Sequence, residues 1–119
     1  MENCIFCKIV AGEAPARVVY ESDTILGFAP INEVAMGHSL LIPRAHFRDL
    51  FDMDEAVLAD LSVAAKSLAT QLIFEHGATG VNLLHASGVD AQQSVFHFHL
   101  HVVPRYPDDG LNLWIRQGL

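Results

Sequence analysis

The run from His97 to His101 reads His-Phe-His-Leu-His, so three imidazoles alternate with large apolar side chains. Successive side chains of a β-strand point to opposite faces of the sheet. If a strand covers 96–103, the three histidines share one face and the apolar residues share the other. Neighbouring imidazoles then lie roughly 7 Å apart, because a strand rises about 3.3 Å per residue. Such a strand, apolar behind and basic in front, is a candidate functional site.

The size and charge of the chain narrow its class. Its 119 residues predict one domain over 1–119. No apolar run approaches 18 residues, and the N-terminus lacks a basic segment followed by a long apolar one, which predicts a cytoplasmic protein with no membrane partner. Seven Lys and Arg against fourteen Asp and Glu give a net charge of −7. This charge repels phosphate backbones and argues against a nucleic-acid partner.

The chain has two cysteines, Cys4 and Cys7, in a Cys-x-x-Cys pair. No further cysteines are present for a disulfide framework. A redox motif usually follows a strand in a βαβ unit, whereas only three residues precede this pair. Two thiolates could instead form half of a tetrahedral zinc site, with His46 and one of the three clustered histidines as the other ligands. Two plain buried thiols are the alternative.

The hydrophobic pattern predicts two helices. Residues 4–10 have helical spacing, and a long amphipathic helix covers 54–76, with Asp52 and Glu55 as its capping box and Gly77 as its stop. Short apolar runs predict strands at 18–21, 24–28, 39–42, 80–84 and 96–103. Consecutive strands with few helices between them favour an α+β fold, with an antiparallel sheet of about five strands and the helices on one side.

A polar loop over 85–95 ends just before the histidines. Its Ser, Gly and Gln residues could wrap an oxyanion and donate hydrogen bonds to it. The imidazoles themselves could ligate a metal, move a proton or attack an electrophile. A catalytic zinc held by all three is disfavoured, because the outer two would lie about 13 Å apart on a strand. We therefore expect separate roles, with His99 central.

The sequence resembles the histidine triad superfamily of nucleotide hydrolases and transferases, whose motif alternates three histidines with apolar residues. Further landmarks occur in the family's order, and the nearest branch is the nucleotide-binding, phosphoramidase-like (Hint-type) one. These landmarks are Cys4 to Ile9, Gly37-His38, Ile42 to His46, Gln93 to Phe96, His97 to Val103 and Pro104-Arg105.

The resemblance implies a reaction at phosphorus that needs no catalytic cofactor. His99 would attack the α-phosphorus of a nucleoside 5′-phosphoramidate or a related conjugate, and water would then hydrolyse the nucleotidyl-histidine. His101 would bind the phosphoryl oxygens, helped by the backbone of the Gln93-Ser94 turn. The side chains of Gln93 and Ser94 would reach the phosphate or the departing amine. His97 would be structural.

The resemblance also implies a metal, a base pocket and a partner. His97 would complete a possible structural zinc site with Cys4, Cys7 and His46. Family members usually form a two-fold homodimer through the long helix and a strand. An apolar pocket would take the purine base of the nucleotide, with Leu40 or Leu41 nearby, and its other positions are Ile5, Phe6, Ile9, Phe28 and Ile31.

Three positions depart from the family's pattern. Pro30 replaces an acidic residue that holds the ribose hydroxyls, Ala86 replaces an asparagine near the phosphate, and Gln92 replaces a glycine. A glutamine in that turn predicts an altered or strained backbone. These changes leave open a nucleotide-binding or partner-docking module with little turnover. His38 and His85 have no clear task in the sequence, so surface or packing roles are expected for them.

Overall fold

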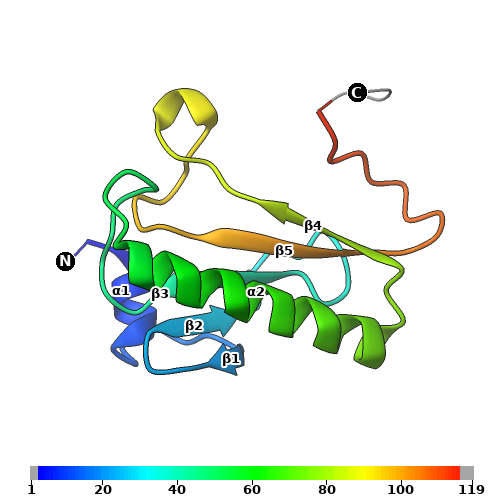
Figure 1. Cartoon of the computed structure of the whole chain (residues 1–119), viewed down its shortest axis with the longest axis horizontal. Helices are drawn as coiled ribbons and strands as arrows, with labels where there is room; N and C mark the ends of the chain where they lie inside the picture. Colours follow the sequence, from blue (N-terminus) through cyan, green and yellow to red (C-terminus); the bar gives the residue numbers. More distant parts are fainter. Residues whose placement is uncertain (1–2, 116–119) are drawn as a thin grey trace.

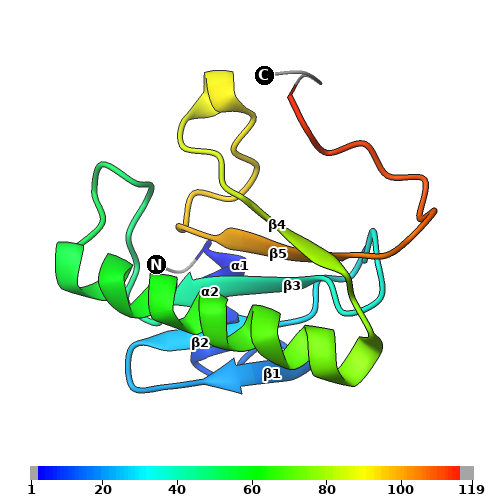
Figure 2. The ribbon, with the colours of Figure 1, turned by 45° about the vertical axis from the view of Figure 1, so that its right-hand side comes forward.

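The computed structural model of the protein describes residues 3–115 and confirms the α+β fold. Its five-stranded sheet has the order β1-β2-β3-β5-β4, and every neighbouring pair is antiparallel. Figure 2 shows the strands stacked in this order. The elements along the chain are α1 (Ile5–Val10), β1 (Val18–Glu21), β2 (Ile25–Phe28), β3 (Ser39–Pro43), α2 (Glu55–His76), β4 (Gly80–Leu84), η1 (Val89–Ala91) and β5 (Leu100–Arg105).

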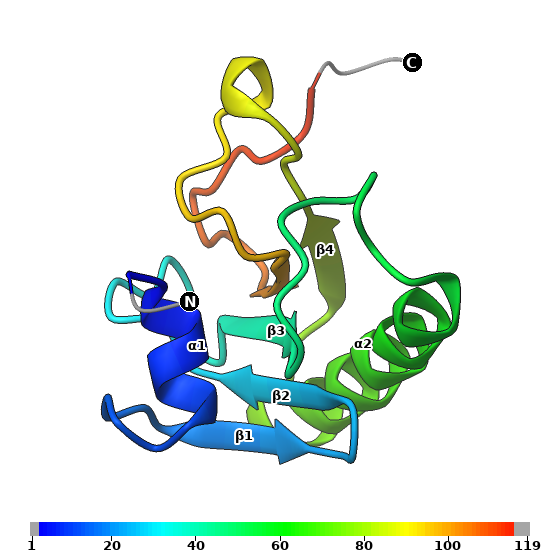
Figure 3. The same cartoon turned by 90° about the vertical axis from the view of Figure 1, so that its left-hand side faces the viewer.

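The two helices cover opposite faces of the sheet, so the prediction of helices on one side is wrong (Figure 3). Every residue of β2 and β3 is buried. Alternate side chains of these strands therefore need cover on both faces. Ile25 and Leu41 pack in a core with α2, whereas Leu26 and Leu40 pack in a second core with Phe6 of α1.

The long helix α2 begins and ends on side-chain and backbone signals (Figure 1). Its N-cap is Asp54, whose carboxylate accepts the Val57 N–H, so the predicted capping box from Asp52 is wrong. The Asp52 carboxylate instead accepts the Arg48 N–H. Gly77 ends the helix in the left-handed conformation, as predicted, with φ of 71°.

By length and composition, α2 is apolar enough to cross a membrane. In this fold it packs one stripe of side chains against the sheet. The buried residues of that stripe are Leu61, Ala64, Ala65, Leu68 and Leu72. A core role thus explains this stripe, whereas Val63, Ile73 and Phe74 of α2 are exposed.

The histidine run is only partly a strand, because β5 begins at Leu100. The Phe98 N–H donates to the carbonyl of Phe47, at 2.7 Å, rather than to a strand neighbour. His97 and His99 therefore precede the ladder, which corrects the strand predicted over 96–103. The alternation still holds, since Phe98 packs in the core beneath α2 while the rings of His97 and His99 contact Phe6 on the other face.

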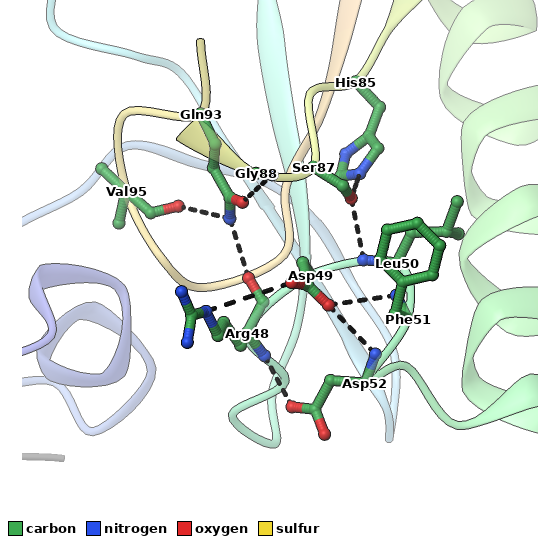
Figure 4. Close-up of polar contacts among 10 residues, drawn as sticks. All are labelled: Arg48, Asp49, Leu50, Phe51, Asp52, His85, Ser87, Gly88, Gln93 and Val95. Carbon is green, nitrogen blue, oxygen red and sulfur yellow. Dashed lines mark hydrogen bonds and ion pairs between the residues drawn. The ribbon is translucent and has the colours of Figure 1, made fainter. Parts of the chain in front are cut away.

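The loop between β4 and β5 is fastened to the segment 48–52 by polar contacts (Figure 4). The buried Gln93 side chain accepts the Gly88 N–H and donates to the carbonyls of Arg48 and Val95. Gln92, just before it, has φ of 72°. Residues other than glycine rarely adopt this left-handed conformation, because their Cβ crowds the backbone. The prediction of a strained turn at Gln92 is therefore confirmed.

We expect Gln92→Gly to stabilise the protein by up to about 1 kcal/mol, because glycine adopts positive φ without strain. Gly77→Ala is the matched control with the opposite expected effect, because it introduces a Cβ at a similar positive φ. This Cβ would touch nothing within 4 Å, so only the backbone strain matters. That change should cost about 1 kcal/mol. Urea unfolding at unchanged m measures both. A lower midpoint for Gln92→Gly would show that this turn is not strained.

Candidate functional site

A cavity of about 850 Å³ opens on the face of the sheet that carries α1. His99, His101 and Ser94 are among the residues that line it. Leu40 lines it, whereas Leu41 is fully buried in the core beneath α2. The remaining predicted pocket positions also line it, namely Ile5, Phe6, Ile9, Phe28 and Ile31. The cavity is thus a mainly apolar groove whose lining includes the imidazoles of His99 and His101.

The ring of His99 is held in one tautomer by a backbone carbonyl. Its Nδ1–H donates to the carbonyl of His97 at 2.9 Å, because a carbonyl oxygen can only accept. In the neutral ring, Nε2 therefore carries the lone pair. Burial lowers the pKa of His99 below its ordinary value of 6.5, so the ring is neutral near pH 7. The site thus presents an unprotonated nitrogen.

His101 is held in the complementary tautomer by His38. The Val34 N–H donates to Nδ1 of His38, which leaves the proton of the neutral His38 ring on Nε2. That Nε2 lies 3.0 Å from Nδ1 of His101, which accepts. The proton of His101 is then on its own Nε2. Burial, together with the nearby imidazoles, lowers the pKa of His101 to about 4. His101 is therefore a neutral hydrogen-bond donor.

The loop residues Gln93 and Ser94 have different positions. Ser94 is exposed and lines the cavity. Gln93 does not line the cavity, and the structure does not bring its side chain to the site as expected. Its amide is occupied by the loop contacts described above, and its main-chain N–H donates to the carbonyl of Gly88. Gln93 shapes the turn that presents Ser94.

Four metal-ligating side chains converge beside this site. One ligand atom from each of Cys4, Cys7, His46 and His97 lies within 4.8 Å of every other. Nδ1 of His97 is 3.4 Å from the Cys4 sulfur, and Nδ1 of His46 is 3.3 Å from the Cys7 sulfur. Two sulfurs and two nitrogens are the donor set of a tetrahedral structural zinc site.

The surroundings of His97 fit the same conclusion. Its Nε2–H donates to the carbonyl of Pro43 at 2.8 Å, which leaves Nδ1 free to act as a ligand. Metal-binding histidines usually anchor their second nitrogen in this way. His97 is fully buried, and burial lowers its pKa to about 4, so the ring is in the neutral form that a metal needs. These residues can hold a structural zinc ion.

The sequence did not reveal the part played by two histidines. His38 is buried against His101 and sets its tautomer, so the expectation of a surface or packing role missed this contact. The Gly37-His38 pair is one of the family landmarks in the sequence, but nothing local in it indicates a partner 63 residues away. His85 stacks on Phe98, as a packing role requires, and its Nδ1 also contacts the carbonyl of His99.

Comparison with known proteins places this arrangement in a family. Residues 11–108 match the HIT domain. The protein named "Protein hit" of Bacillus subtilis is 40% identical over 105 residues, which are 88% of this chain and 72% of that protein. Adenylylsulfatase HINT3 of Arabidopsis thaliana is 34% identical, over 98% of this chain and 58% of that protein.

A solved structure agrees in fold. The crystal structure of a zinc-bound histidine triad family protein from Mycobacterium smegmatis superposes with a TM-score of 0.90 at 38% identity. The match covers 94% of this chain and 81% of that one.

We expect the His101 ring to make stability depend on pH. Its pKa is about 4 when folded and near 6.5 when unfolded, so the unfolded chain binds the proton first. The contribution of His101 to the free energy of unfolding should therefore fall by up to about 3 kcal/mol as the pH drops from 6.5 to 4. In His101→Asn the fall should be smaller, as measured by urea unfolding at each pH. The same change at the exposed His76 is the control, and equal slopes in all three proteins would contradict the assignment.

The metal cluster predicts that purified protein holds about one zinc ion per chain. Chelation should lower the melting temperature, and added zinc should restore it, because an ion that binds only the folded state stabilises it. Cys7→Ser should abolish both the bound zinc and the response. Elemental analysis and thermal unfolding measure these effects. Undiminished zinc in Cys7→Ser would show that the ion lies elsewhere.

Proposed function

The chain belongs to the HIT domain family, and on that basis we propose that it is a nucleotide hydrolase or transferase acting through a covalent nucleotidyl-histidine. The proposed substrates are nucleoside 5′-phosphoramidates or related nucleotide conjugates. The observation that carries the proposal is the pair of tautomers in the cavity. His99 offers a lone pair on Nε2, and His101 offers an N–H beside it.

In the first step, Nε2 of His99 attacks the α-phosphorus, and the P–N bond breaks as the amine leaves with a proton taken from the solvent, which regains one when water is consumed in the second step. The Nε2–H of His101 donates to a phosphoryl oxygen, where negative charge develops. The ring centroids of His99 and His101 are 5.5 Å apart, close enough to act on one phosphoryl group. In the second step, water displaces His99 and releases the nucleoside monophosphate. Ser94 is proposed to contact the phosphate or the amine.

The apolar length of the cavity supports a planar base as the other half of the substrate. Phe6 packs edge-on against both Phe28 and His99, so one ring links the base pocket to the nucleophile. The relative named an adenylylsulfatase supports a nucleotide conjugate as the substrate class. A purine base is proposed from the family resemblance.

We assign zinc a structural role, outside the chemical steps. Of the three clustered histidines, only His97 belongs to the four-residue metal cluster, whereas His99 and His101 line the cavity. A bound zinc would fix His97 and α1 to one another. A zinc hydrolase would instead need the triad imidazoles as its ligands, and the geometry favours the covalent route.

The second candidate function is a nucleotide-binding or docking module with little turnover. Pro30 supports it, because this residue lines the cavity where the family places a carboxylate for the ribose. Gln92 and Ala86 add two changes on the loop that leads to Ser94. These changes affect recognition rather than the imidazoles, so we favour the enzyme.

We propose that the protein is a homodimer. Strand β4 is an edge of the sheet, and Val81 and Leu83 on it are exposed. Leu83 pairs with Val102, whose side chain packs in the core beneath α2. Helix α2 exposes Phe74 as well. Within residues 3–115 this edge has no strand partner, and an edge beside apolar side chains suits a two-fold interface of the kind expected from the resemblance. A cytoplasmic location and one domain over 1–119 stay predictions.

Purified protein should release AMP from adenosine 5′-phosphoramidate, and His99→Ala should lower kcat by at least about 10³-fold because the nucleophile is removed. Mass spectrometry of acid-quenched protein should show the adenylylated chain, and only with His99 present. His76→Ala, at an exposed position, is the control. Turnover retained in His99→Ala would rule out the mechanism. Tight AMP binding by calorimetry without turnover would favour the binding module.

The lack of an acidic residue at Pro30 should weaken selection for the ribose hydroxyls. We expect kcat/KM for adenosine and 2′,3′-dideoxyadenosine phosphoramidates to agree within about threefold. Without a carboxylate at position 30, the two ribose hydroxyls make no hydrogen bond to this residue, so their removal loses none. Pro30→Asp should favour the ribonucleotide by about tenfold, since a carboxylate accepts from ribose hydroxyls. Pro30→Asn is the uncharged control. A strong ribose preference in the parent protein would show that another group replaces the carboxylate.

A further inference from the structure

The main chain of the nucleophile lies just beyond the end of the β-ladder. Strand β4 ends at Leu84, β5 begins at Leu100, and the last ladder pair joins Leu84 to His101. The carbonyl of His99 therefore has to find a hydrogen bond outside the ladder. The imidazole of His85 provides it, with Nδ1 at 2.9 Å from that oxygen. The His85 side chain thus supplies the hydrogen bond that a neighbouring strand would otherwise make to the His99 carbonyl.

The His85 ring is fixed by its other contacts. Because the His99 carbonyl can only accept, Nδ1 of His85 carries the proton. Its Nε2 lies 2.5 Å from the Ser87 hydroxyl, and that oxygen accepts the Leu50 N–H at 2.9 Å (Figure 4). The ring also stacks on the buried Phe98, with centroids 4.2 Å apart. His85 therefore ties the 48–52 segment to the backbone of the nucleophile.

We propose that His85 is a positioning residue for the reaction at His99, acting through the main chain rather than on the substrate. His85 is not among the residues that line the cavity, so it does not face the substrate. Two hydrogen bonds then set the direction of the nucleophile. One joins the His99 ring to the carbonyl of His97, and the other joins the His99 carbonyl to His85. This inference rests on the proposed function of His99.

Loss of the His85 bond should lower kcat more than it raises KM. A nucleophile displaced by about 1 Å can lose on the order of 10²-fold in rate, because attack requires close alignment. The base pocket is built by α1, β2 and β3 and does not include His85. Substrate binding should therefore change little.

Two similar substitutions separate the bond from the bulk of the ring. In His85→Asn, the amide nitrogen sits on Cγ, as Nδ1 of histidine does, and can still donate to His99. In His85→Gln, the amide extends further, toward the position of Nε2 and Ser87. We expect His85→Gln to lower kcat by about 10- to 100-fold with KM within about threefold. His85→Asn should recover kcat to within about threefold of the parent.

The proposal is overturned if the asparagine variant loses as much kcat as the glutamine variant, if both keep the parental kcat, or if KM rises in step. Thermal unfolding confirms that the variants are folded. A parent with no turnover would defeat the proposed function only. Hydrogen exchange of the 96–100 peptide by mass spectrometry then decides. Faster exchange in His85→Gln than in His85→Asn supports the positioning role, and equal exchange in both overturns it.

Discussion

The hydrogen bond from the His99 ring to the carbonyl of His97 determines what this site can do. It fixes the proton of the neutral ring on Nδ1 and leaves the lone pair on the other nitrogen. Both residues are buried, so water does not compete freely for either group. The bond is possible because His97 and His99 lie ahead of β5, where the backbone is not committed to strand pairing. A regular strand through all three histidines would have engaged that backbone differently.

His97 also connects the chemistry to the metal cluster. Its carbonyl orients His99, the proposed nucleophile, while its ring stands between the two thiols and the carbonyl of Pro43. An ion held by Cys4, Cys7, His46 and His97 would therefore immobilise the residue that aims His99. Helix α1 brings both thiols to this point, and its Phe6 touches His97 and His99 together. A structural metal and a metal-free reaction are compatible, because they use different parts of one residue.

Local patterns in the sequence predicted the fold well. The five strands and both helices follow from apolar periodicity, and the separation of His97 and Phe98 onto opposite faces follows from alternation. The pattern could not show that β2 and β3 are buried on both faces, which places α1 opposite α2. The sequence pattern also assigned the N-cap of α2 to Asp52, whereas the N-cap is Asp54, which carries the same carboxylate two residues later.

Predictions of the site were limited by contacts between distant residues. The Cys-x-x-Cys spacing predicted a zinc site with His46 and one of the clustered histidines, the family resemblance added His97 and the apolar groove, and the structure brings those residues together. The tautomer of His101 depends on His38, and the main chain of His99 depends on His85. Neither dependence has a local signal, because each joins a side chain to a partner fixed only by the sheet. Gln93 is the opposite case. Its place beside the motif suggested a contact with the substrate, but its side-chain amide is hydrogen-bonded to Gly88 and Arg48 instead.

The electrostatics of the cavity resolve an apparent conflict between the net charge of −7 and the anionic substrate proposed for this site. Among the described residues that line the cavity, Arg17 is the one permanent cation, and it is paired with Glu33 at 2.9 Å. The phosphoryl group would instead meet neutral imidazoles whose protons are already oriented. Oriented dipoles in a site with little water stabilise developing charge without reorganising, whereas the diffuse negative field of the surface is screened by salt. The proposed substrate would thus be selected by the direction of a few N–H bonds and not by the net charge of the protein.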